Sequence, residues 1–177
     1  MNEPLPDTLI LDRLDTPIGT AIVVTDEAGV LRAFNWTDYE ERMNAWISRR
    51  YPGAAVRAGR SPIRAALEAY FAGEVKALER LAWAAIGTSF QRQVWTALCQ
   101  IPTGETWSYA RLAQAVGRPT AVRAVGLANG SNPVALVVPC HRVIGSNGTL
   151  TGYGGGLPRK RWLLAHEGAS FRDQMAA

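Results

Sequence analysis

The chain is built around the stretch Val138-Pro139-Cys140-His141-Arg142-Val143-Ile144. An apolar run from Val134 leads into Pro139, which fixes its own φ and has no N–H for a sheet ladder. Adjacent residues of a strand point to opposite faces, so a contact between Cys140 and His141 needs an irregular turn or a bridging water. Pro139 supplies that irregularity. We therefore expect a turn that carries a thiol and an imidazole side by side.

The two side chains of this turn suit covalent chemistry. A thiol is a strong nucleophile only as the thiolate, and a free cysteine with a pKa of about 8.5 is mostly protonated at neutral pH. Imidazole is the side chain best suited to accept that proton near pH 7. The chain has only two cysteines and two histidines, and this turn holds one of each. The competing interpretation is a buried structural cysteine beside a surface histidine, because cysteine is often buried.

Length and composition indicate an ordinary folded protein. The 177 residues are 47% hydrophobic and 19% charged, which suffices to bury a core in one domain or in two small ones. The net charge of +4 is compatible with a polyanionic partner if the excess gathers on one face. The N-terminus lacks the basic flank and apolar core of a signal peptide, and no apolar run could span a bilayer. We expect a cytoplasmic protein without a membrane partner.

The two cysteines indicate neither a disulfide framework nor a metal centre. No CxxC pair has the spacing of zinc ligands, and a Cys99–Cys140 bridge is disfavoured in a reducing cytosol. Cys99 ends an apolar helical run, residues 94–99, where we expect it to be a small core residue. We expect no metal.

The N-terminal half has the pattern of a small α/β unit. Runs rich in Ile, Val and Leu, separated by turn residues, predict strands at 9–14, 18–25 and 30–36. Helices are expected at 39–51 and from Ser61 to Gly73, with Ser61 as cap, whereas 75–86 is ambiguous between strand and helix. This half carries no nucleophile–base pair and no glycine-rich phosphate loop, so we assign it a scaffolding role.

The C-terminal half reads as a series of short capped helices. Helices are expected from Thr88 or Ser89 to 98, over 108–117 and over 121–129, the last two joined by a short turn with Gly117. Two helices joined in this way are typical of a helix-turn-helix. A glycine-rich loop at 151–156 precedes a final helix at 157–166, with Lys160 and Arg161 expected on its exposed side.

The helix expected at 121–129 is unusual for a DNA reader. Its centre is made of small residues, and Arg123 is its only long cation. Reading of the major groove normally needs several polar side chains, whereas small residues around one arginine suit close approach to a narrow groove. The alternative is a helix pair that packs for its own stability and contacts no nucleic acid.

Together these motifs resemble the O6-alkylguanine-DNA alkyltransferase family. The resemblance covers residues 88–168 at matching spacings and rests on Ser108-Tyr109, Arg123-Ala124-Val125-Gly126, Asn132-Pro133, the stretch around Cys140, Gly152-Tyr153-Gly154-Gly155 and Glu167. It implies an α+β chain with an RNase H-like α/β domain at 1–86. A mostly helical, winged helix-turn-helix-like domain at 87–177 would carry the active site.

The resemblance also implies roles for single residues. Cys140 would take the alkyl group from a flipped-out guanine, and His141 would accept the thiol proton through a water. Glu167 would orient His141, and Asn132 would hold the neighbouring backbone or the thiol. The pocket residues would be Tyr109 as donor to N3, the Gly154 N–H toward O6, the carbonyls of Cys140 and Val143, and Tyr153 as a wall. The DNA contacts would come from Arg123 as the finger in the base stack, with Ala121, Ala124, Gly126 and Ser146.

A member of this family would carry out direct-reversal DNA repair. It would move the O6-alkyl group of guanine, and the O4-alkyl group of thymine, irreversibly to Cys140, once per molecule and with base flipping from the minor groove. Its partner would be double-stranded DNA containing alkylated guanine, and it would act as a monomer without cofactor or metal.

Three other functions fit parts of the same pattern. An unreactive lesion binder would lack the nucleophile that Cys140 supplies. A cysteine hydrolase would use Cys140, His141 and Glu167 or Asn132 on acyl substrates. A regulator would use the helix-turn-helix for sequence-specific binding.

Overall fold

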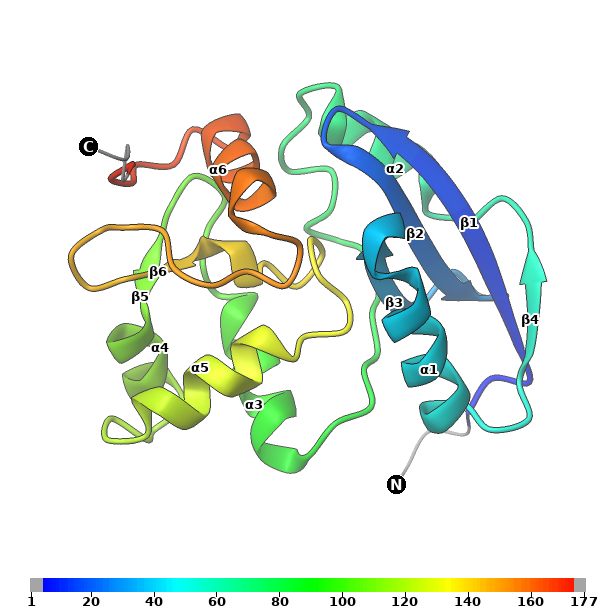
Figure 1. Cartoon of the computed structure of the whole chain (residues 1–177), viewed down its shortest axis with the longest axis horizontal. Coiled ribbons are helices and arrows are strands. Elements are labelled where there is room, and N and C mark those ends of the chain that lie inside the picture. The colour runs from blue at the N-terminus through cyan, green and yellow to red at the C-terminus, as the bar shows by residue number, and fades with distance from the viewer. Residues whose placement is uncertain (1–4, 174–177) are drawn as a thin grey trace. The chain divides into compact units, whose positions relative to one another are not determined.

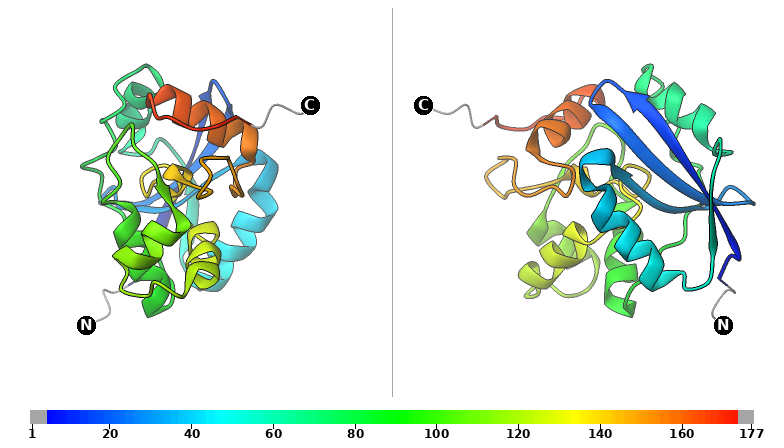
Figure 2. Two further views of the ribbon diagram at one scale, coloured as in Figure 1. Left: turned by 90° about the vertical axis from the view of Figure 1, so that its left-hand side faces the viewer. Right: turned by 45° about the vertical axis from the view of Figure 1, so that its right-hand side comes forward.

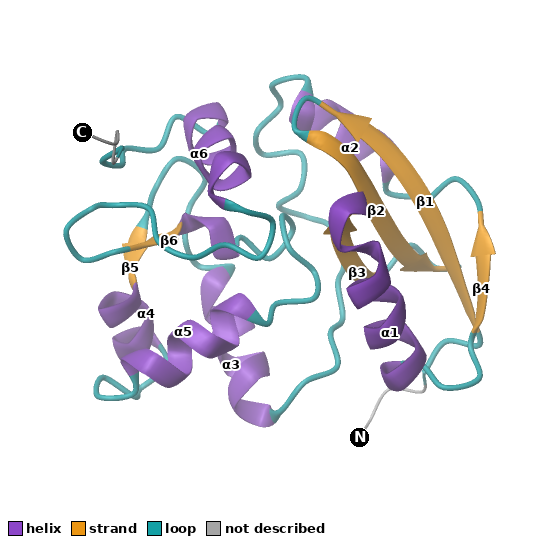
Figure 3. Cartoon of the chain, in the orientation of Figure 1, coloured by secondary structure: helices purple, strands orange, loops and turns teal. Residues whose placement is uncertain are grey.

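The computed structural model describes residues 5–173 and divides the chain into two compact units, Met1–Ile86 and Gly87–Ala177. The first unit holds the main sheet, and the second consists mostly of helices and loops (Figures 1 and 3). The coarse prediction of a mixed α/β chain is confirmed. None of the described helices is long and apolar enough to cross a bilayer.

The first unit is a four-stranded sheet with the order β3-β2-β1-β4. The strands β1 (Thr8–Thr16), β2 (Gly19–Asp26) and β3 (Leu31–Trp36) are antiparallel neighbours and agree with the three predicted strands. The edge strand β4 (Ala55–Ala58) pairs parallel to β1 and was not predicted. All four of its side chains are exposed, so it has no alternation of apolar and polar residues to reveal it.

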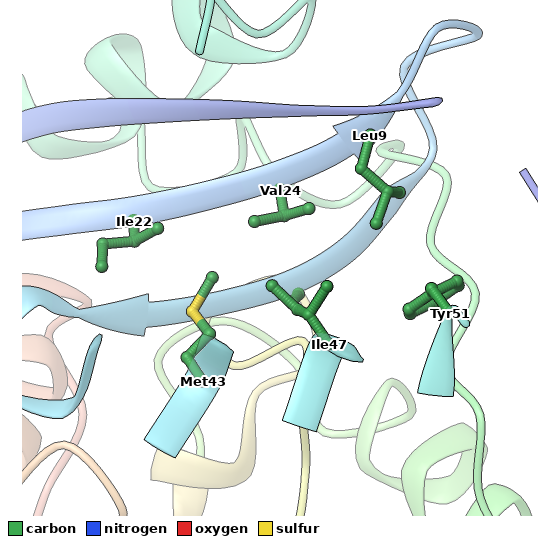
Figure 4. Close-up of a cluster of buried hydrophobic side chains, with 7 residues drawn as sticks. Leu9, Ile22, Val24, Met43, Ile47 and Tyr51 are labelled. Atoms are coloured by element: carbon green, nitrogen blue, oxygen red, sulfur yellow. The ribbon is translucent and has the colours of Figure 1, made fainter. Parts of the chain in front are cut away.

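The core of this unit forms where helix α1 (Glu40–Arg50) packs on the sheet. Side chains of the strands point toward the helix and meet side chains one turn apart on it, as Figure 4 shows. Strand residues alternate between faces and helix residues repeat every three to four positions, so both patterns bury one face. The buried cluster consists of Leu9, Ile22, Val24, Ala33, Met43, Ile47 and Tyr51.

Helix α2 (Arg64–Phe71) begins later than the sequence predicted. Ser61 does not cap it. Its backbone N–H donates to Asp12 Oδ2 at 2.9 Å, and its hydroxyl lies 3.2 Å from the hydroxyl of Thr25 on β2. The serine therefore fastens the segment before the helix to the sheet. Residues 75–86 form turns, with a single bridge between Trp83 and Leu31.

The second unit contains three short helices in mutual contact: α3 (Ser89–Leu98), α4 (Tyr109–Ala115) and α5 (Val122–Gly130). Thr88 caps α3 with a capping box. Its hydroxyl accepts from the Gln91 N–H, and the Gln91 side-chain oxygen accepts from the Thr88 N–H. Ser108 caps α4 in the predicted manner. Cys99 is a correction: α3 ends at Leu98, and the cysteine beyond it is exposed and not part of the core.

The rest of the second unit holds the segment around Cys140. The short strands β5 (Trp107–Ser108) and β6 (Val143–Ile144) pair in parallel. A 3-10 turn η2 (Cys140–Arg142) immediately precedes β6, and helix α6 (Leu157–His166) packs against η2. Figure 2 shows α6 on the opposite side of this unit from α4 and α5 in both views, with the glycine-rich loop before it.

Candidate active site

The predicted irregular turn is present. Pro139, at φ −84° and ψ 64°, leads into η2, whose three residues Cys140, His141 and Arg142 are all buried. His141 is wholly inaccessible, and Cys140 retains 6% of its surface. The prediction of an irregular turn at Pro139 that carries Cys140 and His141 is confirmed.

Asn132 fixes the segment that leads into this turn. Its Oδ1 accepts from the Val134 N–H at 3.1 Å, and its Nδ2 donates to the Val138 carbonyl at 2.8 Å. The backbone between these two bonds contains Leu136 at φ 75°, a left-handed conformation that costs energy for a leucine. Asn132 therefore stabilises a strained loop whose end carries Cys140.

Glu167 holds the imidazole from one side. The Oε1 atom of Glu167 lies 2.9 Å from Nε2 of His141, and both side chains are fully buried. Burial alone would raise the pKa of Glu167, but His141 and Arg142 outweigh it and hold that pKa below the ordinary carboxyl value. An ionised carboxylate accepts the Nε2 proton, which leaves Nδ1 with the free lone pair. Nδ1 is buried and has no hydrogen-bond partner within the part of the chain described.

Arg142 is a site residue to which the sequence analysis gave no role. Its Nε donates to Glu167 Oε2 at 2.8 Å, and its Nη2 donates to Oε1 at 3.0 Å. Its Nη1 donates to the Ile101 carbonyl at 2.8 Å, and its Nη2 also donates to the Thr103 hydroxyl at 3.2 Å. A guanidinium in this forked arrangement fixes the carboxylate in one orientation. Its position directly after Cys140 and His141 was the feature of the sequence that could have indicated a role in the site.

The electrostatics of the buried pair keep both groups neutral at rest. Burial raises the pKa of the Cys140 thiol, while a hydrogen bond from Asn132 and the charge of Lys160 oppose that shift. Burial also lowers the pKa of His141, although Glu167 acts in the opposite direction. A neutral imidazole can accept a proton, so the buried turn contains a candidate base for the thiol.

The prediction for Lys160 was also wrong. It was expected on the exposed side of α6, yet it is fully buried, with Leu163 and Leu164. Its Nζ lies 2.5 Å from the Val143 carbonyl, 2.7 Å from that of Thr151 and 3.2 Å from that of Gly152. Positions three and four apart share a helix face, so the spacing to the two leucines was the signal that could have revealed it.

The residues expected to form a base pocket lie on the elements around the turn. Tyr109 begins α4, is half-buried, and receives a hydrogen bond from the Thr151 hydroxyl at 3.4 Å. Burial raises the pKa of this phenol, so it stays protonated and can donate. Val143 is buried on β6, Tyr153 is half-buried, and Gly154 is exposed in the glycine-rich loop.

The residues expected to contact DNA fall in two places. Arg123 and Ala124 are exposed on α5, and Ala121, just before this helix, is half-buried. Gly126 faces α4, because a Cβ added there would meet the Tyr109 ring at 3.7 Å. Ser146 is exposed in the separate turn at 145–148. The exposed surface of α5 also includes Leu127, which is 77% accessible.

Residues 5–173 contain no group of three His, Cys, Asp or Glu side chains arranged to hold a metal ion. Neither Cys99 nor Cys140 forms a disulfide.

Comparisons with known proteins indicate one family. The family model described as "6-O-methylguanine DNA methyltransferase, DNA binding domain" matches residues 89–169. A methylated-DNA–protein-cysteine methyltransferase of Salmonella typhimurium is 48% identical over 90% of this chain and 96% of its own length. Its counterpart from Mycolicibacterium paratuberculosis is 47% identical over 87% of this chain and 89% of its own.

A solved structure shows the same similarity at the level of the fold. The crystal structure of Mycobacterium tuberculosis OGT in complex with DNA has a TM-score of 0.75 and 42% identity, and it covers 89% of this chain and 92% of that one. Identity of this extent over nearly the whole length of both chains shows that this chain belongs to the methylated-DNA–protein-cysteine methyltransferase family.

Proposed function

We propose that this protein repairs DNA by transferring the O6-alkyl group of guanine, and the O4-alkyl group of thymine, to the sulfur of Cys140. The observation that carries the proposal is the buried Cys140-His141 turn with Nε2 of His141 held by Glu167 at 2.9 Å. The family relationship supports the same reaction, because relatives of nearly the same length carry the name of a methylated-DNA–protein-cysteine methyltransferase.

The proton path follows from which imidazole nitrogen is occupied. Nε2 of His141 donates to Glu167, so Nδ1 accepts the Cys140 proton, through a water that reaches the buried turn with the substrate. The thiolate then attacks the alkyl carbon in line. The S–C bond forms, the C–O6 bond breaks with its electron pair on oxygen, and a proton returns to the guanine.

The leaving guanine requires hydrogen-bond donors as its negative charge develops. Tyr109 donates to N3, and the raised pKa of its phenol keeps that proton in place. The Gly154 N–H reaches O6, the carbonyls of Cys140 and Val143 accept from the exocyclic amine, and Tyr153 walls the pocket. Asn132 supports the thiol through its bonds on both sides of the preceding loop.

The helices α4 and α5 form the helix-turn-helix of a winged domain that binds double-stranded DNA from the minor groove. Arg123 enters the base stack in place of the flipped nucleotide, while Ala121, Ala124 and Gly126 permit close approach and Ser146 contacts the backbone. The first unit, an RNase H-like scaffold, supports this domain. We propose that the protein acts as a cytoplasmic monomer without cofactor or metal.

Mass spectrometry of the protein after mixing with duplex DNA containing O6-methylguanine tests the reaction. One methyl group should appear on the peptide that contains Cys140, and none on a Cys140→Ala variant. A Cys99→Ser variant, which changes the exposed cysteine, should react like the wild type. The thioether is not readily hydrolysed, so moles of product should not exceed moles of protein.

Together with binding and turnover assays, this experiment separates the competing functions. Tight binding of the lesion without a gain in mass would indicate an unreactive binder. Turnover of acyl substrates beyond one per protein would indicate a cysteine hydrolase. A strong sequence preference in binding to undamaged DNA would indicate a regulator.

A further inference from the structure

The buried lysine of α6 is not used by the reaction as proposed above. Lys160 is fully buried, and its ammonium group lies within hydrogen-bond distance of the carbonyls of Val143, Thr151 and Gly152. An ammonium group has three N–H donors, so all three are directed to backbone oxygen. Burial of a charge is costly unless hydrogen bonds compensate it, and here three backbone carbonyls do so.

The three carbonyls belong to two segments assigned to the proposed base pocket, strand β6 and the glycine-rich loop. Val143 directly follows the catalytic turn, and its carbonyl is the proposed acceptor for the exocyclic amine of guanine. Thr151 and Gly152 begin the glycine-rich loop, which continues to the proposed wall Tyr153 and the proposed O6 donor Gly154. Lys160 therefore connects the strand that reads one edge of the base with the loop that reads another.

We propose that Lys160 is a positioning residue that sets the spacing between the Val143 carbonyl and the glycine-rich loop, and thereby fits the pocket to guanine. This inference rests on the proposed function. A carbonyl oxygen accepts two hydrogen bonds, so Val143 can bind Lys160 and the guanine amine together. The lysine fixes the direction of the lone pair that remains. The loop itself contains four glycines in residues 151–156 and has little stiffness of its own.

A different role would be purely electrostatic, because the charge of Lys160 also favours the thiolate of Cys140. The two roles differ in what they predict for reagents that do not use the pocket. If the role is electrostatic, removal of Lys160 slows every reaction of the thiol. If the role is positioning, removal of Lys160 slows only the reactions in which the base must fit between Val143 and the loop.

The test compares Lys160→Met with Arg161→Met, the neighbouring exposed cation that pairs with Asp173, both in a Cys99→Ser background. Three rates are measured: methyl transfer from O6-methylguanine in a duplex, transfer from O6-methylhypoxanthine in the same duplex, and alkylation of Cys140 by iodoacetamide. Hypoxanthine lacks the 2-amino group. Circular dichroism and thermal unfolding establish that each variant is folded.

We expect Lys160→Met to slow transfer from O6-methylguanine by about 100-fold, the scale of a catalytic group displaced by about 1 Å. Its preference for methylguanine over methylhypoxanthine should shrink toward unity, while alkylation by iodoacetamide stays within about twofold of the wild type. Arg161→Met should behave as wild type in all three. If Lys160→Met does not fold, Lys160→Gln carries the test, because it keeps two N–H donors without the charge.

An equal loss in all three rates would overturn the positioning role in favour of the electrostatic one. An unchanged transfer rate, or a base preference as large as that of the wild type, would also overturn it. Failure of the wild type and of Arg161→Met to transfer any methyl group would instead contradict the proposed function itself.

Discussion

The Nε2 atom of His141 lies 2.9 Å from Oε1 of Glu167, and both side chains are inaccessible to solvent. This contact assigns the imidazole tautomer, because the ionised carboxylate can only accept. The nitrogen that remains for proton transfer is the buried Nδ1, which we propose accepts the Cys140 proton. The first prediction tests that assignment.

Glu167→Gln should slow methyl transfer by about 100-fold or more, the usual contribution of general acid–base catalysis. The amide oxygen will turn toward Arg142, so its NH₂ faces Nε2 and forces the proton onto Nδ1, where it blocks acceptance from the thiol. Single-turnover rates on duplex O6-methylguanine measure the effect. Asp173→Asn, an exposed carboxylate-to-amide change, is the control and should leave the rate unchanged. A wild-type rate in Glu167→Gln would exclude the assigned tautomer.

Acid should destabilise the native state through the same carboxylate. The pKa of Glu167 is lowered on folding, so the native state binds this proton more weakly than the unfolded chain does. The resulting stabilisation is complete above the ordinary glutamate pKa of about 4.3 and is lost as the pH falls below it, by at most about 1.4 kcal/mol per pH unit for this group. Urea unfolding between pH 7 and pH 3 should show a shallower acid decline for Glu167→Gln. An equal decline in the free energy of unfolding of the wild type and of Glu167→Gln would contradict the lowered pKa.

Arg142→Met should destabilise the protein by about 3–5 kcal/mol, because it leaves a buried carboxylate without its forked partner. Denaturant unfolding at pH 7 measures the loss. The matched control is Arg161→Met, which breaks an exposed ion pair with Asp173 and should cost about 0–1 kcal/mol. Similar losses for the two variants would show that the Arg142 pair contributes no more than a surface pair does.

Arg123→Ala should slow repair in duplex DNA by about 10–100-fold, since base flipping costs a few kcal/mol and the variant no longer occupies the vacated place. Reaction with O6-methylguanine in a short single strand should be nearly unaffected, because no base pair must be opened. Arg57→Ala, an exposed arginine on β4 of the first unit, serves as the control. Equal losses on single-stranded and duplex substrates would remove the finger role.

Local patterns predicted most of the regular structure. The strands β1 to β3 and the helices α3, α4 and α6 follow apolar periodicity and capping residues that act over a few positions, so a window of sequence contains the information. The predictions that failed concern residues whose structure depends on a partner distant in the sequence. Ser61 looked like a helix cap but binds Asp12 and Thr25, and β4 exists only because β1 offers an edge.

The sequence by itself indicated a candidate nucleophile and a candidate base, and it determined the irregular turn that holds them, because these depend on adjacent residues and on the fixed φ of proline. The family resemblance, and no local pattern, indicated Glu167. Only the tertiary structure decided that Arg142 binds that carboxylate 25 positions away, and that Lys160 binds the Val143 carbonyl 17 positions away. Buried charges find their partners through packing of distant segments, and neither charge nor helical propensity at a single position specifies which segments will meet.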